Sequence, residues 1–137
     1  LGTFALITGH GLKELTSEFE KDNDDYNSIM SKIIADRLVE AFSEKMHEMI
    51  RKDLWSYSKN ESLSINDMIK EKYHGIRPAP GYPACPDHQH KDYIWQMLDV
   101  EKNTGITLTE TRSMFPAASL SGWYFSNPKS KYFMISS

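Results

Sequence analysis

Residues 76–88 read IRPAPGYPACPDH and contain four prolines and one glycine in thirteen positions. Proline fixes the backbone angle φ and has no N–H to donate, so this stretch forms neither a helix nor a central strand. Ile76, Tyr82 and Cys85 are side chains that disordered proline-rich segments rarely carry, and the sequences on both sides have helical patterns. We therefore predict an ordered loop that holds the Arg77 guanidinium toward an anionic ligand or an acidic side chain.

The overall composition predicts a single domain over residues 1–137. The length suits one hydrophobic core, and no repeat, charge block or low-complexity linker divides the chain. The net charge of -3 provides no broad basic surface, so we expect no nucleic-acid or membrane partner. No apolar run approaches the roughly 18 residues of a membrane span, and the first residues lack a signal-peptide pattern. Together with the single cysteine, these features predict a cytoplasmic protein.

Residues 24–55 have the strongest periodicity in the sequence. Apolar side chains recur at helical spacing, and Asn23, Asp24 and Asp25 are available to cap the first turn. We predict a long amphipathic helix whose apolar face packs on the core. The apolar positions are Ile29, Met30, Ile33, Ile34, Leu38, Ala41, Phe42, Met46, Met49 and Ile50.

A second stripe of this helix carries polar side chains. At 100° per residue, Asp36, Glu40 and His47 fall within about 40° of one another and face away from most of the apolar positions. One interpretation is a solvated face with Lys32 and Arg37 as ion-pair partners. A second is that Asp36 and Glu40 hold a cation or a polar ligand. A third is a buried ion pair between one of these carboxylates and the arginine of the proline-rich loop.

Shorter elements precede and follow that loop. Residues 3–8 are apolar and β-prone, and they predict a strand that ends in a glycine-rich turn. Residues 64–75 predict a second helix with Ser64 at its N-cap, and residues 89–103 predict a third that ends at Gly105.

Beyond the third helix the apolar period changes from helical spacing to two. Residues 106–110 predict a short strand, and the last part of the chain predicts an antiparallel hairpin. The hairpin strands span residues 119–126 and 131–137 and are joined by a turn at 127–130.

Aromatic and apolar side chains alternate between the two faces of the predicted hairpin, and Gly122 leaves room for a backbone or a ligand to approach it closely. We predict an α+β fold in which an antiparallel sheet with this aromatic hairpin packs against the long amphipathic helix and the shorter helices. Trp123, Phe125, Tyr132 and Met134 alternate with Tyr124, Phe133 and Ile135.

A metal site is one chemical alternative. Cys85, His88 and His90 offer thiolate and imidazole groups, which are good zinc ligands, but the C-x-x-H-x-H pattern lacks a second ligand pair at customary spacing. Cys85 also lacks a helix N-terminus or a positioned histidine that would activate it as a nucleophile. An anionic ligand on Arg77 is the stronger hypothesis, and the aromatic strands offer a flat surface on which a base could stack.

Four stretches resemble the C-terminal activation domain of cobalamin-dependent methionine synthases. The resemblance is close from about residue 24 to 133 and looser before it. Its most specific parts are RPAPGYP at 77–83 and SGWYFSNPKSKYF at 121–133. The other stretches are residues 24–55 and residues 94–110.

The resemblance implies a function. In that family the domain binds S-adenosylmethionine, and the parent enzyme transfers a methyl group from methyltetrahydrofolate to homocysteine through cobalamin. When the cobalamin is oxidised to cob(II)alamin, reactivation needs an electron from flavodoxin or a flavoprotein reductase and a methyl group from S-adenosylmethionine. We therefore expect a reactivation domain whose partners are the cobalamin-binding domain of methionine synthase and the flavoprotein. The alternative is a docking module that contacts these partners without using a ligand.

The same resemblance implies the binding residues. Arg77 matches the family position that holds the methionyl carboxylate, and Tyr82 matches one near the ligand or the corrin ring. The aromatic pair matches Tyr132 and Phe133, and Asp36 and Glu40 match acidic residues that face the site. Ala79, in the same motif as Arg77, completes the expected set.

The family domain extends beyond this sequence on both sides and contributes a further acidic contact upstream. We therefore expect residues 1–137 to be one domain that is part of the full activation domain, and to be inactive as an enzyme in isolation.

Overall fold

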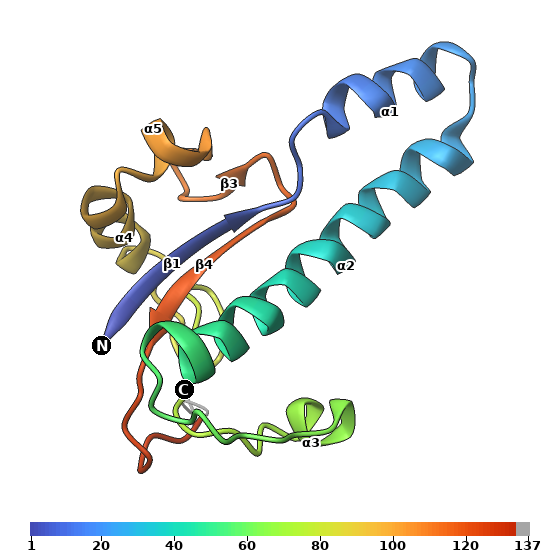
Figure 1. Cartoon of the computed structure of the whole chain (residues 1–137). Coiled ribbons are helices and arrows are strands. Elements are labelled where there is room, and N and C mark those ends of the chain that lie inside the picture. Colours follow the sequence, from blue (N-terminus) through green and yellow to red (C-terminus); the bar gives the residue numbers. More distant parts are fainter. Residues whose placement is uncertain (134–137) are drawn as a thin grey trace.

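The computed structural model describes residues 1–133 and has a mixed α+β architecture, as predicted (Figure 1). Its centre is an antiparallel pair of strands, β1 (Gly2–Ile7) and β4 (Ser119–Tyr124), in which Gly2 lies opposite Tyr124 and Ile7 opposite Ser119. A second, two-residue pair is formed by β2 (Thr107–Leu108) and β3 (Met114–Phe115). The helices are α1 (Leu12–Lys21), α2 (Asp25–Met49), its π-helical continuation η1 (Ile50–Leu54), α3 (Ile65–Ile69), α4 (His90–Leu98) and α5 (Val100–Thr104).

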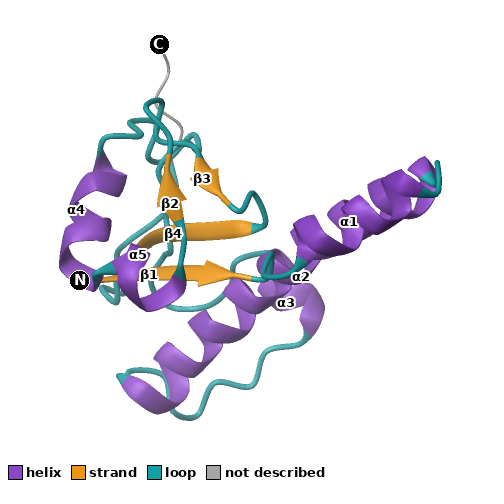
Figure 2. Cartoon of the chain, turned by 90° about the horizontal axis from the view of Figure 1, so that it is seen from above, coloured by secondary structure: helices purple, strands orange, loops and turns teal. Residues whose placement is uncertain are grey.

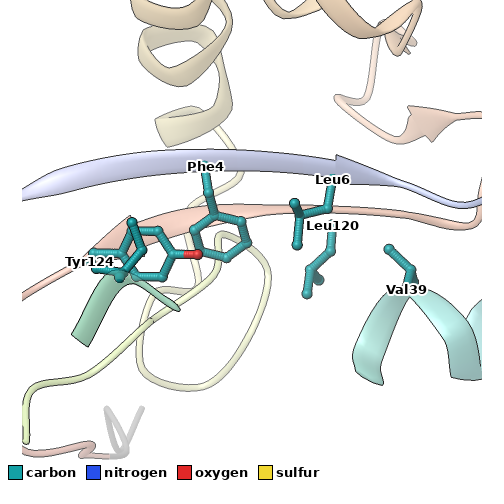
Figure 3. Close-up of a cluster of buried hydrophobic side chains, with 6 residues drawn as sticks. Phe4, Leu6, Val39, Leu120 and Tyr124 are labelled. Atoms are coloured by element: carbon teal, nitrogen blue, oxygen red, sulfur yellow. The ribbon is translucent and has the colours of Figure 1, made fainter. Parts of the chain in front are cut away.

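Helices cover both faces of the β1–β4 pair. In Figures 1 and 2, α2 lies on one side of the strands, and α4 and α5 lie on the other. Because side chains alternate along a strand, the two faces bury different sets of residues. Figure 3 shows the face toward α2, where Phe4, Leu6, Leu120 and Tyr124 cluster with Val39 of the helix. On the opposite face Ala5, Ile7 and Trp123 pack against Ile94, Val100 and Ile106.

Helix α2 has nearly the predicted length, and Asp24 caps it by accepting a hydrogen bond from the Asn27 amide (3.0 Å). The prediction of its buried face was wrong. The buried side chains are small or polar: Ser28, Ala35, Val39, Ser43 and His47. Most of the large apolar side chains expected in the core are 40–57% exposed, namely Ile29, Ile33, Ile34, Leu38 and Phe42.

The small buried residues explain this orientation. They let the helix backbone come close to the strands, and the Thr8 hydroxyl after β1 donates to the Ala35 carbonyl at 2.7 Å. The aromatic rings of the sheet, such as Phe4 and Tyr124, which stack at 4.7 Å, then fill the interface. Large aliphatic side chains on that side of α2 would hold the helix too far away for this contact.

The other helices depart from the predicted bounds. Helix α1 was not predicted, and it packs along the N-terminal half of α2 (Figure 1). Helix α3 has the predicted N-cap Ser64, which forms a capping box with Asp67, but the helix ends at Ile69. The helix expected at 89–103 is two helices, because Asp99 takes a left-handed conformation (φ 46°) that short polar side chains tolerate. None of the described helices has the length and apolar character needed to cross a membrane.

The predicted hairpin is also wrong. Strand β4 pairs with β1, and residues 126–133 contain no strand. The expected positions Met134 and Ile135 lie outside the described residues. The other edge of β4 is occupied by the start of the proline-rich loop: the Ile76 and Phe125 backbones exchange two hydrogen bonds of 2.9 Å.

The loop and the sheet approach each other closely at Gly122, as the sequence suggested. The Trp123 amide donates to the Pro78 carbonyl at 2.9 Å. A Cβ atom on Gly122 would lie 2.6 Å from that carbonyl oxygen and 2.8 Å from the Phe4 ring. The loop therefore rests directly on the strand, and the absence of a side chain at 122 makes this contact possible.

We predict that Gly122→Ala lowers the free energy of unfolding by about 1–3 kcal/mol, because neither the Pro78 backbone nor the Phe4 ring has space to retreat. Urea denaturation provides the measurement. The neighbouring variant Ser121→Ala is the control: the Ser121 hydroxyl is buried without a partner among the described residues, so its removal costs little. Equal stability of the glycine variant and the wild type would contradict the close approach.

Candidate functional site

A pocket of about 440 Å³ opens where α2, the proline-rich loop and the last described residues meet. Six of the seven predicted site residues line it. They are Glu40, Arg77, Ala79, Tyr82, Tyr132 and Phe133. The seventh, Asp36, lies in an adjoining hollow that shares Glu40, Tyr82 and Leu120 with the pocket. The fold thus gathers residues from three separate parts of the sequence around one space.

Arg77 is held by its backbone and by its side chain. Its amide donates to the Tyr132 hydroxyl (2.9 Å), and its Nη2 donates to the carboxylate of Glu44. The side chain is only 16% exposed. Burial alone would lower the pKa of Arg77, but the Glu44 carboxylate outweighs it and holds the pKa above its usual value.

The ion pair differs from the predicted one. The partner of Arg77 is Glu44, one helical turn beyond the expected Asp36 and Glu40. The row of acidic residues at 36, 40 and 44 was a signal for it, since positions four apart share a helix face. Glu44 engages only Nη2 of the guanidinium, and Arg77 Nε is buried without a partner among the described residues.

Tyr82 also lines the pocket. Its hydroxyl donates to Glu40 Oε1 at 3.3 Å, and its ring is 49% exposed. Burial, and then the nearby Glu40 charge, raise the pKa of Tyr82. The ring is carried by a tight turn in which the Cys85 amide donates to the Tyr82 carbonyl at 2.8 Å. The loop is therefore ordered, as predicted.

The C-terminal aromatic pair closes the pocket from the third side. The Tyr132 hydroxyl accepts the hydrogen bond from the Arg77 amide and lies 3.4 Å from the Tyr73 hydroxyl. Burial, and then the Tyr132 hydroxyl, raise the pKa of Tyr73. Phe133 is 61% exposed at the rim. Both aromatics come from an irregular segment rather than from the predicted strand.

Glu71 also lines the pocket and was not predicted. It lies just beyond α3, in a stretch that the sequence pattern assigned to a regular helix, so no periodic signal marked it. Pro78, Pro83, Ala84 and Leu120 complete the lining.

His47 does not share the exposed stripe predicted for it. It is fully buried, stacked 5.3 Å from Tyr124 and edge-on to Tyr73 at 4.8 Å. Neither ring nitrogen has a hydrogen-bond partner among the described residues. Burial, followed by the positive charges of Arg51 and Arg77, lowers the pKa of His47 to about 3. This histidine is a neutral packing residue beneath the pocket.

The alternative metal centre is not assembled. Among residues 1–133, no three His, Cys, Asp or Glu side chains are arranged to hold a metal ion. His88 Nδ1 lies 3.0 Å from Lys91 Nζ, and burial raises the pKa of the Cys85 thiol, which disfavours a thiolate ligand.

Taken together, the residues that line the pocket offer one arginine, two carboxylates and aromatic surfaces. Such a set suits a ligand that carries a carboxylate, positive charge and a flat apolar ring system.

Comparison with known proteins finds a matching family model and matching solved structures. The family model described as the vitamin B12 dependent methionine synthase activation domain matches residues 1–137. A solved structure, described as the MetH reactivation domain bound to AdoHcy, is 55% identical, with a TM-score of 0.92. The match covers 96% of this chain and 41% of that one, so this chain spans less than half the length of its structural relative.

We predict that acid destabilises the fold through His47. Because the pKa is near 6.5 in the unfolded chain and about 3 in the fold, the unfolded state binds more protons between these values. The contribution of His47 to stability is complete above pH 6.5 and is lost as the pH falls toward 3, by at most about 1.4 kcal/mol per pH unit.

Urea denaturation between pH 7 and pH 4 measures this effect, and His47→Phe should flatten the profile while keeping the ring stack. The exposed His74, changed to Gln, is the matched control and should leave the slope unaltered. Parallel profiles for wild type and His47→Phe would show that His47 is not the group responsible.

Proposed function

The chain belongs to the family of activation domains of vitamin B12-dependent methionine synthase, and on this basis we propose that its pocket binds S-adenosylmethionine. The observation that carries the proposal is the convergence of Arg77, Glu40, Tyr82 and Tyr132 on one pocket of about 440 Å³, a volume typical of small-molecule sites.

The charges of the ligand match the charges of the pocket. S-adenosylmethionine carries a carboxylate, an ammonium and a sulfonium group. Arg77, whose Nη2 is paired with Glu44, binds the carboxylate through a remaining N–H of its guanidinium, in a charge-assisted hydrogen bond. Glu40, which also lines the pocket, interacts with the positively charged groups. Asp36 lies in the adjoining hollow together with Arg37, whose positive charge opposes its own, so it contributes little to the potential in the pocket.

The aromatic residues suit the adenine ring. Tyr132 is fixed by its bond to the Arg77 amide, and Phe133 beside it exposes a flat surface at the rim. An adenine stacked on this pair is held without base-specific hydrogen bonds. Ala79 is buried in the wall, where its small side chain leaves room for the ligand.

In the proposed role the domain presents a methyl donor to cobalamin carried by another domain of methionine synthase. Cobalamin supplies the metal that accepts the methyl group. The residues of this pocket bind and orient the sulfonium, and none of them is needed as an acid, a base or a nucleophile. The half-exposed Tyr82 and the exposed Phe133 leave the pocket open toward that partner.

The proposal also concerns the extent of the domain. We propose that residues 1–137 form part of a longer activation domain, since the solved relative is more than twice as long. The exposed apolar side chains of α2, from Ile29 to Phe42, then pack against flanking polypeptide. A cytoplasmic location, flavodoxin or a flavoprotein reductase as electron donor, and activity only within the whole enzyme belong to the same proposal.

We predict that Arg77→Ala weakens S-adenosylmethionine binding by roughly 10- to 100-fold, because a charge-assisted hydrogen bond contributes about 1.5–3 kcal/mol. Titration calorimetry measures the affinity. Methylthioadenosine, which lacks the amino-acid part, should bind both proteins equally and thereby show that the variant is folded.

Arg112→Ala is the matched control, because Arg112 pairs with Asp92 at 2.8 Å, outside the residues that line the pocket. An equal loss of both ligands by Arg77→Ala would contradict the assignment of the carboxylate. Absence of binding by the wild type and by a longer protein with its flanking residues would contradict the function itself.

A docking module is the second candidate, and the exposed apolar face of α2 favours it. Leu38 is 53% exposed and Phe42 40% exposed, side by side on the helix. Apolar surface of this size on a helix is typical of a protein interface.

If docking is the function, the isolated cobalamin-binding domain should capture this chain without S-adenosylmethionine, and Leu38→Glu should abolish capture by placing a charge in the interface. Lys13→Glu, on the exposed surface of α1, is the control. Capture that requires S-adenosylmethionine and survives Leu38→Glu would reject docking through this face.

A further inference from the structure

The carboxylates of the pocket outnumber its basic groups. Arg77 is the one basic residue that lines it within the described chain, and its guanidinium is already paired with Glu44. Glu40 and Glu71 form no ion pair among residues 1–133, and the recorded side-chain hydrogen bond of Glu40 comes from the neutral Tyr82 hydroxyl. Two negative charges therefore face the pocket without compensation.

Neighbouring charges do not cancel this excess. Asp36 and Arg37 lie together in the adjoining hollow, where their charges oppose each other. Lys131 lines a separate apolar groove, which lies beyond Pro78 and Phe133. The surplus of negative charge thus belongs to the pocket that Arg77 and Tyr132 define.

This surplus of negative charge affects the binding of the ligand before and after it loses its methyl group. The inference rests on the proposed function. S-adenosylmethionine has a net charge of +1. When its methyl group passes to the acceptor as a cation equivalent, the carbon–sulfur bond breaks, its electron pair stays on sulfur, and a neutral thioether remains. The amino-acid and adenosine parts are unchanged, so the two molecules differ in one positive charge and one methyl group.

We propose that Glu40 and Glu71 make the pocket selective for the sulfonium form, so that transfer of the methyl group itself weakens the hold on the product. Arg77 and the aromatic pair bind parts common to both forms and contribute affinity without discrimination. The two glutamates act as specificity residues: they lower the free energy of the cationic ligand and leave that of the neutral thioether nearly unchanged.

The exposure of the two glutamates determines how strongly the pocket prefers S-adenosylmethionine to the neutral thioether. Both glutamates are exposed, so each interaction resembles a solvent-screened ion pair and not a buried one. We expect the wild type to bind S-adenosylmethionine about 3- to 10-fold more tightly than S-adenosylhomocysteine at low ionic strength. High salt should reduce the ratio, because screening acts on the charged ligand more than on the neutral one.

The experiment measures both dissociation constants by titration calorimetry, at about 20 mM and about 500 mM salt. The proteins are the wild type, Glu40→Gln, Glu71→Gln and the double variant. Glutamine keeps the size and an oxygen acceptor while removing the charge. Glu101→Gln, on α5 and exposed, changes the net charge equally and is the matched control.

Each outcome has one meaning. The proposal predicts that the affinity ratio falls toward one in the double variant and at high salt, and that Glu101→Gln keeps the wild-type ratio. An unchanged ratio in the double variant, even with both ligands bound more weakly, would overturn the selectivity and leave the binding function standing. A wild type that binds neither ligand would overturn both.

Discussion

The backbone contact between residues 76–78 and β4 is the constraint on which the rest of the site depends. The Ile76 and Phe125 backbones exchange two hydrogen bonds, and the Trp123 amide bonds to the Pro78 carbonyl. Three backbone hydrogen bonds hold the start of the loop along the edge of β4, and Gly122 makes the approach possible. With its neighbours on both sides fixed in this way, Arg77 is directed toward α2, where Glu44 receives it.

The charged groups that line the pocket differ in their pairing from the buried charged groups elsewhere in the fold. Outside the residues that line the pocket, Arg51 and Glu61 form a buried ion pair at 2.6 Å, and the Arg51 guanidinium lies 4.5 Å from the centre of the Tyr73 ring. Glu61 accepts hydrogen bonds from Nε and Nη2 of Arg51 and so balances its buried charge, while Nη1 is buried without a partner among the described residues. Around the pocket, Glu40 and Glu71 have no ion-pair partner among the described residues. The unmatched charges therefore occur where a ligand can reach them.

The sequence predicted the structure correctly where a residue type restricts the backbone in one definite way. The prolines of the loop excluded regular structure, and Gly122 indicated a close approach. Both features are present. The family motif named residues that the fold brings around one pocket, although spacing alone could not show that Arg77 and Tyr132, 55 positions apart, share a hydrogen bond.

Other features depend on contacts that periodicity does not encode. Helix α2 has apolar side chains around much of its surface. Val39 is buried and Leu38 exposed because of the way the helix packs on the strands, which periodicity alone does not show. The hairpin was predicted because its two strands are neighbours in the sequence. Strand β4 instead pairs with β1, at the other end of the described chain. An ion pair of Arg77 with this acidic row was one of the interpretations, but periodicity does not show which turn of the helix the loop reaches, and the partner is Glu44.

A crystal structure of the protein with S-adenosylmethionine is the most direct test of the account. It should show the methionyl carboxylate within hydrogen-bond distance of the Arg77 guanidinium and the adenine against Tyr132 and Phe133. A ligand bound elsewhere on the molecule, or an Arg77 that makes no contact with it, would contradict the central claim that the proline-rich loop is held on β4 to present Arg77 to this ligand.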